Sequence, residues 1–435
     1  HHLFYKPEIP ENQLNMDIKR RLYGLMASLE IADLHFDFIR EKYYDLLKKS
    51  RDDLNLEQLA PKYIEDIVKN KFLFHATIYS FLEQDKYIKA LNFSKIAIRH
   101  EPNFKEAWFY KGVFLDKLER CDEAIECFDK ALEIDPNFKE AWFYKGLSLG
   151  DLERYKEAIE CYDRALEIDP KEKKAWINKG LSLAKLERYK EAIECYDRAL
   201  EIDPNYKEAW NNKGVSLANL ERYKEANEFF DKAIEIDPNY KEAWVNKGLS
   251  LDDSERYENA IKCFDKALEI DPNFKEAWVN KGSSLAKLER YKEAIECCDK
   301  AIEIDPKEKK AWINKGLSLD DLERYDEAVE CFDKALEIDP NYKEAWFNKG
   351  ISLANLERYK EAIECCDKAL EIDPNYASAW YNKACVESLE TNKNQALESL
   401  RRAIELDPKY KVKAKTDSDF DNIRDSKEFK ELIGD

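Results

Sequence analysis

Adjacent carboxylates are the first residues of this sequence whose type and spacing could do chemistry. Asp252–Asp253 and Asp320–Asp321 each place two acids side by side, and paired carboxylates can act as general acid and general base. Neighbouring residues on a helix point in different directions, however, and no histidine, nucleophile or metal ligand accompanies either pair. We therefore expect these pairs to be solvated or to steer a ligand, and not to catalyse a reaction.

Eleven cysteines are the second candidate for chemistry. Seven recur with one 34-residue spacing and its multiples: Cys127, Cys161, Cys195, Cys263, Cys297, Cys331 and Cys365. Successive copies lie too far apart for a disulfide, which needs Cα atoms within about 7 Å. The chain after His100 has no histidine and no C-x-x-C motif, which argues against a ladder of metal sites. We interpret these cysteines as small buried thiols of a reducing, cytoplasmic compartment, and we expect no metal and no cofactor.

A catalytic helix near the start of the chain is the third candidate. His35 shares a predicted helix with Asp33, Asp37 and Glu41. No nucleophile or Gly-rich phosphate loop accompanies it, and a lone helical histidine is usually structural. We therefore predict that the protein is not an enzyme.

A period of 34 residues organises most of the chain, and such periods are typical of stacked repeats. Ten of the thirteen prolines follow it from Pro102 to Pro408. All nine tryptophans follow it too: Trp108, Trp142, Trp176, Trp210, Trp244, Trp278, Trp312, Trp346 and Trp380.

One period, residues 173–206, shows what each unit builds. Its first half spaces Trp176, Leu181 and Leu183 along a helix, and its second half spaces apolar residues helically from Ala192 to Leu200. Asp203–Pro204 ends the second helix, because proline disfavours helical geometry in the residue before it. The unit is therefore predicted to be a helix–turn–helix hairpin, which buries its apolar faces only when hairpins stack.

The unit resembles the tetratricopeptide-repeat (TPR) family, as found in prokaryotic (archaeal-like) multi-repeat proteins. The family pattern appears as Trp176, Gly180, Ala192, Tyr196, Ala199 and Pro204, and it covers nine units from Lys105 to Pro408. The resemblance implies an all-α, right-handed superhelical solenoid of about ten units. One departure is a lysine before the glycine, as in Lys111, Lys145 and Lys179; we interpret its stem as lying on the core and its charged head as reaching solvent.

Three segments follow from this pattern. Residues 71–408 form the array, with a degenerate copy at 71–104 and nine regular repeats at 105–408. Residues 409–435 are expected to cap the last repeat through Phe420, Ile423, Phe429 and Leu432. Residues 1–70 are expected to be helical, as an N-terminal cap or a small effector module. We interpret His1 and His2 as a tag remnant, and Met16 is one candidate for the native start.

Charge excludes several classes of partner. The formal net charge is −19, and residues 71–408 contribute −17 of it. Phosphate backbones attract the opposite sign, so nucleic acid and anionic membranes are poor candidates, and no apolar run is long enough to span a bilayer. Acidity favours solubility or a preference for basic partners.

The resemblance also implies which residues face the concave groove, counting Lys173 as position one of its unit. The sixth position is asparagine in seven successive units: Asn178, Asn212, Asn246, Asn280, Asn314, Asn348 and Asn382. A carboxamide both donates and accepts, so this column could hold an extended peptide by its backbone, in a ladder similar to that of the O-GlcNAc transferase repeat domain. The alternative is that repeat duplication simply copied the asparagine.

Two further columns are apolar. The fifth position includes Phe109, Phe143 and Phe347, and the ninth is apolar in most units. These residues would form a hydrophobic stripe for a partner, or they would be buried against the next helix. The lysine and asparagine of a TPR clamp for C-terminal carboxylates are absent from these columns.

The leading hypothesis is therefore a non-catalytic scaffold or adaptor that binds an extended or helical segment of a partner protein in the groove. Asn178 to Asn382, the two acidic pairs and the three phenylalanines above are its candidate peptide-binding residues. The alternative is an architectural subunit that assembles a larger complex through residues 1–70 or its edges. The sequence leaves the partner, the pathway and homo-oligomerisation open.

Overall fold

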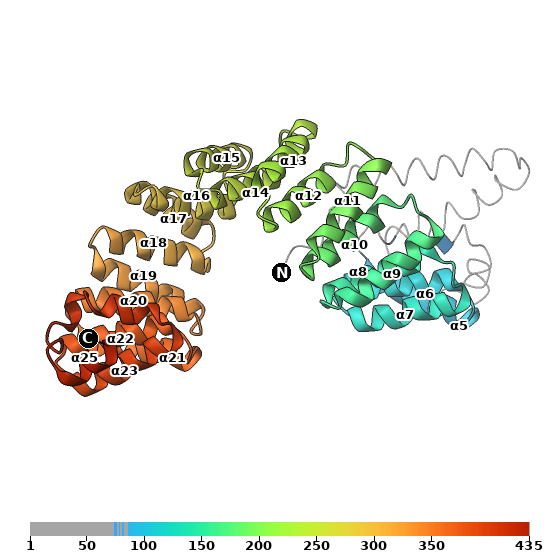
Figure 1. Ribbon diagram of the computed structural model, residues 1–435. Helices are drawn as coiled ribbons and strands as arrows, with labels where there is room; N and C mark the ends of the chain where they lie inside the picture. The colour runs from blue at the N-terminus through green and yellow to red at the C-terminus, as the bar shows by residue number, and fades with distance from the viewer. Residues whose placement is uncertain (1–73, 76–77, 79–80, 82–85, 435) are drawn as a thin grey trace, which may run out of the picture. The chain divides into compact units, whose positions relative to one another are not determined.

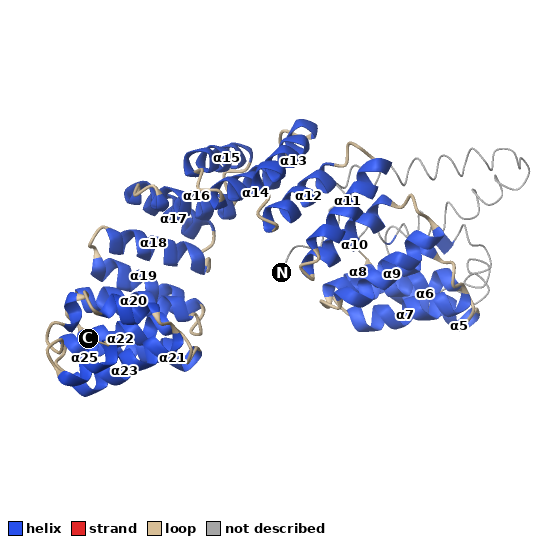
Figure 2. Cartoon of the chain, in the orientation of Figure 1, coloured by secondary structure: helices blue, strands red, loops and turns tan. Residues whose placement is uncertain are grey.

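The computed structural model describes residues 74–75, 78, 81 and 86–434. Every regular element in this part of the chain is helical (Figure 2). Within each of the two compact units described below, consecutive hairpins of about 34 residues stack as in an α-solenoid, which confirms the predicted fold class. The predicted cap or effector module at residues 1–70 lies outside the described residues.

The chain divides into two compact units, with the boundary in the turn after Glu221. The described helices of the first unit (Figure 1) are α5 (Tyr87–His100), α6 (Lys105–Lys117), α7 (Cys121–Ile134), α8 (Lys139–Asp151), α9 (Tyr155–Ile168), α10 (Lys173–Lys185), α11 (Tyr189–Ile202) and α12 (Lys207–Asn219).

The second unit continues the same alternation of 14-residue and 13-residue helices. It contains α13 (Tyr223–Ile236), α14 (Lys241–Asp253), α15 (Tyr257–Ile270), α16 (Lys275–Lys287), α17 (Tyr291–Ile304), α18 (Lys309–Asp321), α19 (Tyr325–Ile338), α20 (Lys343–Asn355), α21 (Tyr359–Ile372), α22 (Ala377–Leu389), α23 (Lys393–Leu406), α24 (Lys409–Ala414), the 3₁₀ turn η2 (Ser418–Phe420) and α25 (Lys427–Ile433).

In five of the described hairpins a ring of the second helix meets a glycine of the first, whereas Cys298 and Cys366 replace the ring opposite Gly282 and Gly350. Gly180 of α10 faces Tyr196 of α11 so closely that a Cβ on the glycine would lie 2.5 Å from the ring. Gly316 faces Phe332 in the same way. The missing side chain lets the two helices approach, and the ring then becomes fully or almost fully buried. The two helices of these five hairpins are therefore held in close contact.

Hairpins join through a tryptophan and a proline carbonyl. In each of nine units the indole Nε1 donates to the carbonyl of the proline six residues earlier, as Trp312 does to Pro306 at 3.0 Å. This bond satisfies the one polar group of a half-buried ring. The 34-residue coincidence of tryptophan and proline thus reflects a contact that fixes the junction between hairpins.

The lysine before each glycine corrects one prediction. From Lys145 to Lys383 its ammonium group, which was expected to reach into solvent, pairs with an aspartate of the preceding hairpin, as in Lys315–Asp299 and Lys349–Asp333, both at 2.6 Å. Lys111 has Lys95 at the position of that aspartate. The side chain is only 24% and 18% exposed in these two pairs, and the ammonium lies over the tryptophan ring of its own helix. The lysine therefore ties one hairpin to the next.

The turn inside each hairpin contains a strained residue. Glu323, between α18 and α19, has φ of 59°, and seven other glutamates and Thr391 occupy the equivalent position with φ between 58° and 69°. A left-handed conformation costs a residue with a Cβ about 1–2 kcal/mol. The residue at this position, glutamate in eight hairpins and threonine in the ninth, therefore lowers the stability of its turn.

Replacing Glu323 with glycine is expected to stabilise the protein by about 1 kcal/mol, since glycine adopts positive φ without strain. The measurement is the midpoint of urea unfolding of the full chain. Glu330→Gly, in the interior of α19, is the matched control and should lower stability by about 1 kcal/mol. A shift of the same sign in both variants would contradict the strain argument.

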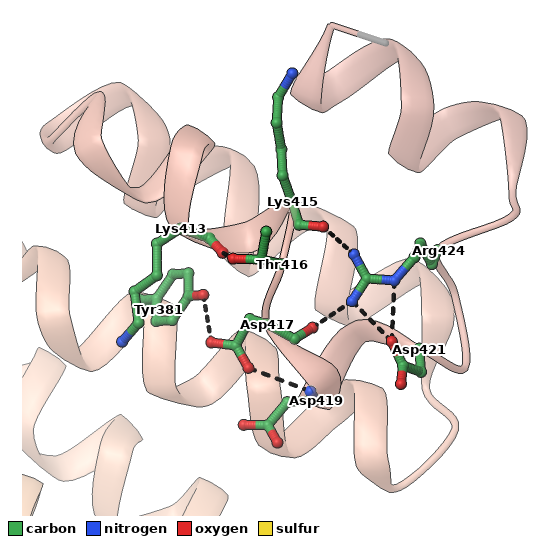
Figure 3. A network of polar contacts seen from close by, with 8 residues as sticks. All are labelled: Tyr381, Lys413, Lys415, Thr416, Asp417, Asp419, Asp421 and Arg424. Atoms are coloured by element: carbon green, nitrogen blue, oxygen red, sulfur yellow. Dashed lines mark hydrogen bonds and ion pairs between the residues drawn. The ribbon is translucent and has the colours of Figure 1, made fainter.

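The C-terminal segment packs on the last hairpin, α22 and α23. Phe420, Ile423 and Phe429 are buried in one cluster with Tyr381 and Leu400, and Leu432 packs against its edge. Figure 3 shows the polar contacts beside this cluster: the Tyr381 hydroxyl donates to Asp417 at 2.6 Å. Arg424 donates to the backbone carbonyls of Lys415 and Asp417. The segment thus covers the apolar end of the stack and fixes its own loop.

The cysteines confirm the packing interpretation. Every cysteine is a free thiol, and all are buried except Cys121, which is half-buried. Burial raises the pKa of Cys161 to about 12 and that of Cys331 to about 11. These thiols therefore stay protonated near neutral pH and are poor nucleophiles.

Candidate functional site

The candidate site is a stripe along the first helix of each hairpin in the second unit. In α14 the stripe consists of Glu242, Asn246, Leu249 and Asp253, which recur at i, i+4, i+7 and i+11 and so share one helix face. Neighbouring first helices, from α14 through α16, α18 and α20 to α22, also contact one another. Their stripes are therefore adjacent within this unit.

The asparagine column lies half-buried along these stripes. Asn246, Asn280, Asn314, Asn348 and Asn382 all keep part of their surface in solvent. Among the described residues, the side chains of Asn280, Asn314 and Asn348 make no hydrogen bond, whereas Asn382 Nδ2 lies 3.5 Å from Cys366 Sγ. Three carboxamides in successive hairpins can thus pair with a ligand without first breaking a bond.

The first unit places its two asparagines differently. Asn178 is only 5% exposed, and its Nδ2 donates to the Lys174 carbonyl at 2.8 Å. The expectation that Asn178 faces a ligand is therefore wrong. Asn212 is half-buried, and its Oδ1 accepts from Asn211 at 3.4 Å.

The fifth position is mostly buried in the core and does not form an exposed stripe. Phe109 is 7% exposed, and Val245, Val279 and Ile313 are each 6% exposed. The next hairpin covers this position, so the hydrophobic-stripe hypothesis is wrong for these residues. Phe143 and Phe347 are half-buried; Phe347 packs on Tyr376 at the following junction.

Exposed apolar surface appears instead at the ninth position. Leu249 of α14 is 37% exposed and Leu317 of α18 is 39% exposed. Both lie one turn after the asparagine of their helix and one turn before an aspartate. The ninth column therefore offers two apolar contact points, with one hairpin between them.

The two aspartates of each acidic pair differ in environment: the first contacts the next hairpin, and the second is exposed. Asp252 is 9% exposed; it accepts from Ser284 Oγ at 2.5 Å and pairs with Lys287. Asp320 accepts from Ser352 Oγ in the same way, and burial raises its pKa. The expectation of solvated carboxylates is therefore wrong for Asp252 and Asp320, which join neighbouring hairpins.

The second aspartate of each pair is exposed. Asp253 and Asp321 end α14 and α18, at the end of the stripe after Leu249 and Leu317. Burial raises the pKa of Asp321, and the negative charge of Glu289 raises it further. Asp321 therefore lies in a locally negative environment where a cation would be favourable.

The serines that donate hydrogen bonds to these buried or half-buried aspartates were not identified in the sequence analysis. Ser284 and Ser352 occupy the tenth position of the unit after each acidic pair, and Ser148 donates to Asp116 at 2.6 Å in the first unit. The signal was available, because aspartate at position twelve is followed in each case by serine 32 residues later. Comparing each unit with the unit that follows it would have identified this aspartate–serine pair.

Comparison with known families decides the identity of this architecture. The tetratricopeptide-repeat model matches eight consecutive segments from 106–138 to 344–376, and a second tetratricopeptide-repeat model matches 365–398. The chain belongs to the tetratricopeptide-repeat family. TPR arrays generally serve as protein-interaction scaffolds, and the TPR chain described above has the architecture of such a scaffold.

Solved structures of other TPR proteins are similar to parts of this chain. YrrB, titled a TPR protein with an unusual peptide-binding site, is 28% identical over 44% of this chain and 98% of its own, with a TM-score of 0.37. MamA is 25% identical over 37% and 94%, with a TM-score of 0.35. A TPR protein from Parabacteroides merdae is 16% identical over 57% and 98%, with a TM-score of 0.49.

Two further comparisons complete the description. No curated protein matches the chain significantly. Among the described residues, every helix is too short or too polar to cross a membrane.

Proposed function

We propose that this TPR protein is a non-catalytic adaptor that holds an extended or helical segment of a partner protein against the first-helix stripe of its second unit. The observation that supports this most is the set of carboxamides on Asn280, Asn314 and Asn348, which are half-exposed and make no hydrogen bond within the described structure. Each can donate to and accept from a peptide group.

The physical cost of these asparagines supports a binding role. A half-buried amide without a partner gives up part of its hydration and gains nothing inside the folded chain. A peptide backbone would supply donors and acceptors along successive helices, whatever its side chains are. The column therefore suits recognition of a backbone, with specificity coming from neighbouring positions.

The architectural alternative remains a second proposal. It places assembly in residues 1–70, which lie outside the described residues, and leaves the stripe idle. Deletion of residues 1–70 distinguishes the adaptor from the architectural subunit. If the shortened protein no longer assembles but still binds peptide, the architectural subunit is favoured.

Replacing Asn280, Asn314 and Asn348 together with alanine is expected to weaken peptide binding by about tenfold to a thousandfold. Each lost hydrogen bond contributes about 0.5–1.5 kcal/mol net, and each 1.4 kcal/mol is tenfold in affinity. Peptides would be selected from a random 16-residue display library on the full chain, and affinities measured by fluorescence anisotropy.

The matched control replaces Asn239, Asn273 and Asn341 with alanine. These asparagines are exposed in junctions between hairpins, so the composition change is identical and binding should not change. Circular dichroism should show equal helicity in both triple variants. Selected peptides that bind all three proteins equally would rule out the asparagine column as the binding site.

A further inference from the structure

The stripes of α14 and α18 carry the same two exposed groups in the same order. Leu249 is followed by Asp253, and Leu317 by Asp321, each pair four residues apart and thus one helical turn apart. Helix α16 lies between α14 and α18 and contacts both. Two identical apolar-plus-acidic points therefore recur in this unit, with one hairpin between them.

The intervening hairpin lacks both groups. At the equivalent positions α16 has Ser283 and Lys287. The Lys287 ammonium is already used, because it pairs with Asp252 at 2.5 Å and lies 5.3 Å from the centre of the Tyr257 ring. The positive charge of Lys287 on α16 therefore stabilises the contact between hairpins. It does not neutralise the two exposed aspartates, Asp253 and Asp321.

The remaining charges on this face are mainly acidic. At the second position of their units, Glu242, Glu276 and Glu344 retain solvent exposure, and Lys310 is the one basic residue of that column in the second unit. Glu289 adds negative charge beside Asp321. A face with this balance attracts basic side chains and repels acidic ones.

We infer that the segment bound by the second unit is basic and amphipathic: it presents two apolar side chains to Leu249 and Leu317, each accompanied by a lysine or arginine for Asp253 and Asp321. This inference rests on the proposed function and specifies its partner. The asparagines hold the backbone, whereas the two leucine–aspartate points select the sequence. Acidic segments of the same length are excluded by charge.

The test uses the same peptide selection on the full chain. The expected result is enrichment of peptides in which lysine or arginine neighbours a large apolar residue. Asp253→Lys combined with Asp321→Lys should weaken these peptides by about tenfold or more at low salt, with a smaller difference at high salt because exposed charges are screened. Leu249→Ser with Leu317→Ser should weaken them at both salt concentrations.

The matched control is Glu296→Lys combined with Glu330→Lys. These glutamates are exposed on the second helices α17 and α19, so the net charge changes equally, away from the stripe. Peptides that depend on the asparagines but lack basic residues, or that bind the aspartate variant unchanged, would overturn the inference and leave the proposed function standing. Failure to select any asparagine-dependent peptide would overturn both.

Discussion

Deletion of residues 409–435 is expected to make the TPR protein self-associate and to lower the stability of its last hairpin by about 5–10 kcal/mol. The segment buries Tyr410, Phe420, Ile423, Phe429 and Ile433 against α22 and α23. Each large apolar side chain that is buried contributes about 1.5–3 kcal/mol, and the conformational entropy lost in ordering the segment offsets part of the sum. The newly exposed face would be apolar. Light scattering coupled to size exclusion, and hydrogen exchange of α23, measure the two effects.

Point variants show whether burial or mere chain length is responsible. Phe420→Ala removes a fully buried ring and should cost about 3–5 kcal/mol. Val412→Ala lies in the same segment but alters a side chain that is 70% exposed, so it should change stability by less than about 0.5 kcal/mol. A truncated protein that stays monodisperse with protected α23 amides would show that the segment does not cap the array.

Gly316→Ala is expected to destabilise the protein, whereas the equivalent Gly350→Ala is not. A Cβ at Gly316 would lie 2.7 Å from the Phe332 ring, but at Gly350 the ring is replaced by Cys366, and the nearest atom is a backbone oxygen at 3.3 Å. Overpacking typically costs about 1–3 kcal/mol, and alanine regains up to about 1 kcal/mol of helix propensity. The net loss at Gly316 should be about 1–2 kcal/mol in urea unfolding.

A double-mutant cycle tests the cause of this difference. Phe332→Cys alone copies the glycine–cysteine pair of Gly350 and Cys366 but leaves a cavity in a hairpin built around a ring, and Gly316→Ala alone creates a clash. In the double variant the added methyl group occupies part of the space that the ring has left. The combined loss should be at least about 1 kcal/mol less than the sum of the two single losses. Additive losses would show that the glycine is needed for a reason other than its ring.

The fold was predictable because the sequence of each hairpin contains the signals that determine its two helices and its turn. The tryptophan and proline periods located every junction, and the spacing of apolar residues predicted two helices per unit. These signals lie within a single unit, so no knowledge of its neighbours was needed. The lysine before the glycine was misread for the opposite reason: its partner, such as Asp299 for Lys315, belongs to the preceding hairpin.

The candidate site was only partly predictable, because exposure depends on what the next hairpin places nearby. Asp252 and Asp253 are chemically identical and adjacent, yet Ser284 and Lys287 of the following hairpin engage the first and leave the second exposed. Phe109 becomes core in the same way, through Phe138 and Tyr144 of the next junction and hairpin. A helical wheel of one unit has no means of distinguishing these cases.

The lysine–aspartate tie between hairpins has a consequence for how such a chain can change in evolution. Lys145–Asp129, Lys315–Asp299 and Lys383–Asp367 join different hairpins through the same atoms at 2.6 Å, so the trailing edge of one hairpin fits the leading edge of many others. A whole 34-residue repeat can therefore be gained or lost without a new interface between hairpins having to evolve. The stretch KEKKAWINKGLSL, present at both 171–183 and 307–319, is the kind of copy that such interchangeable joints permit.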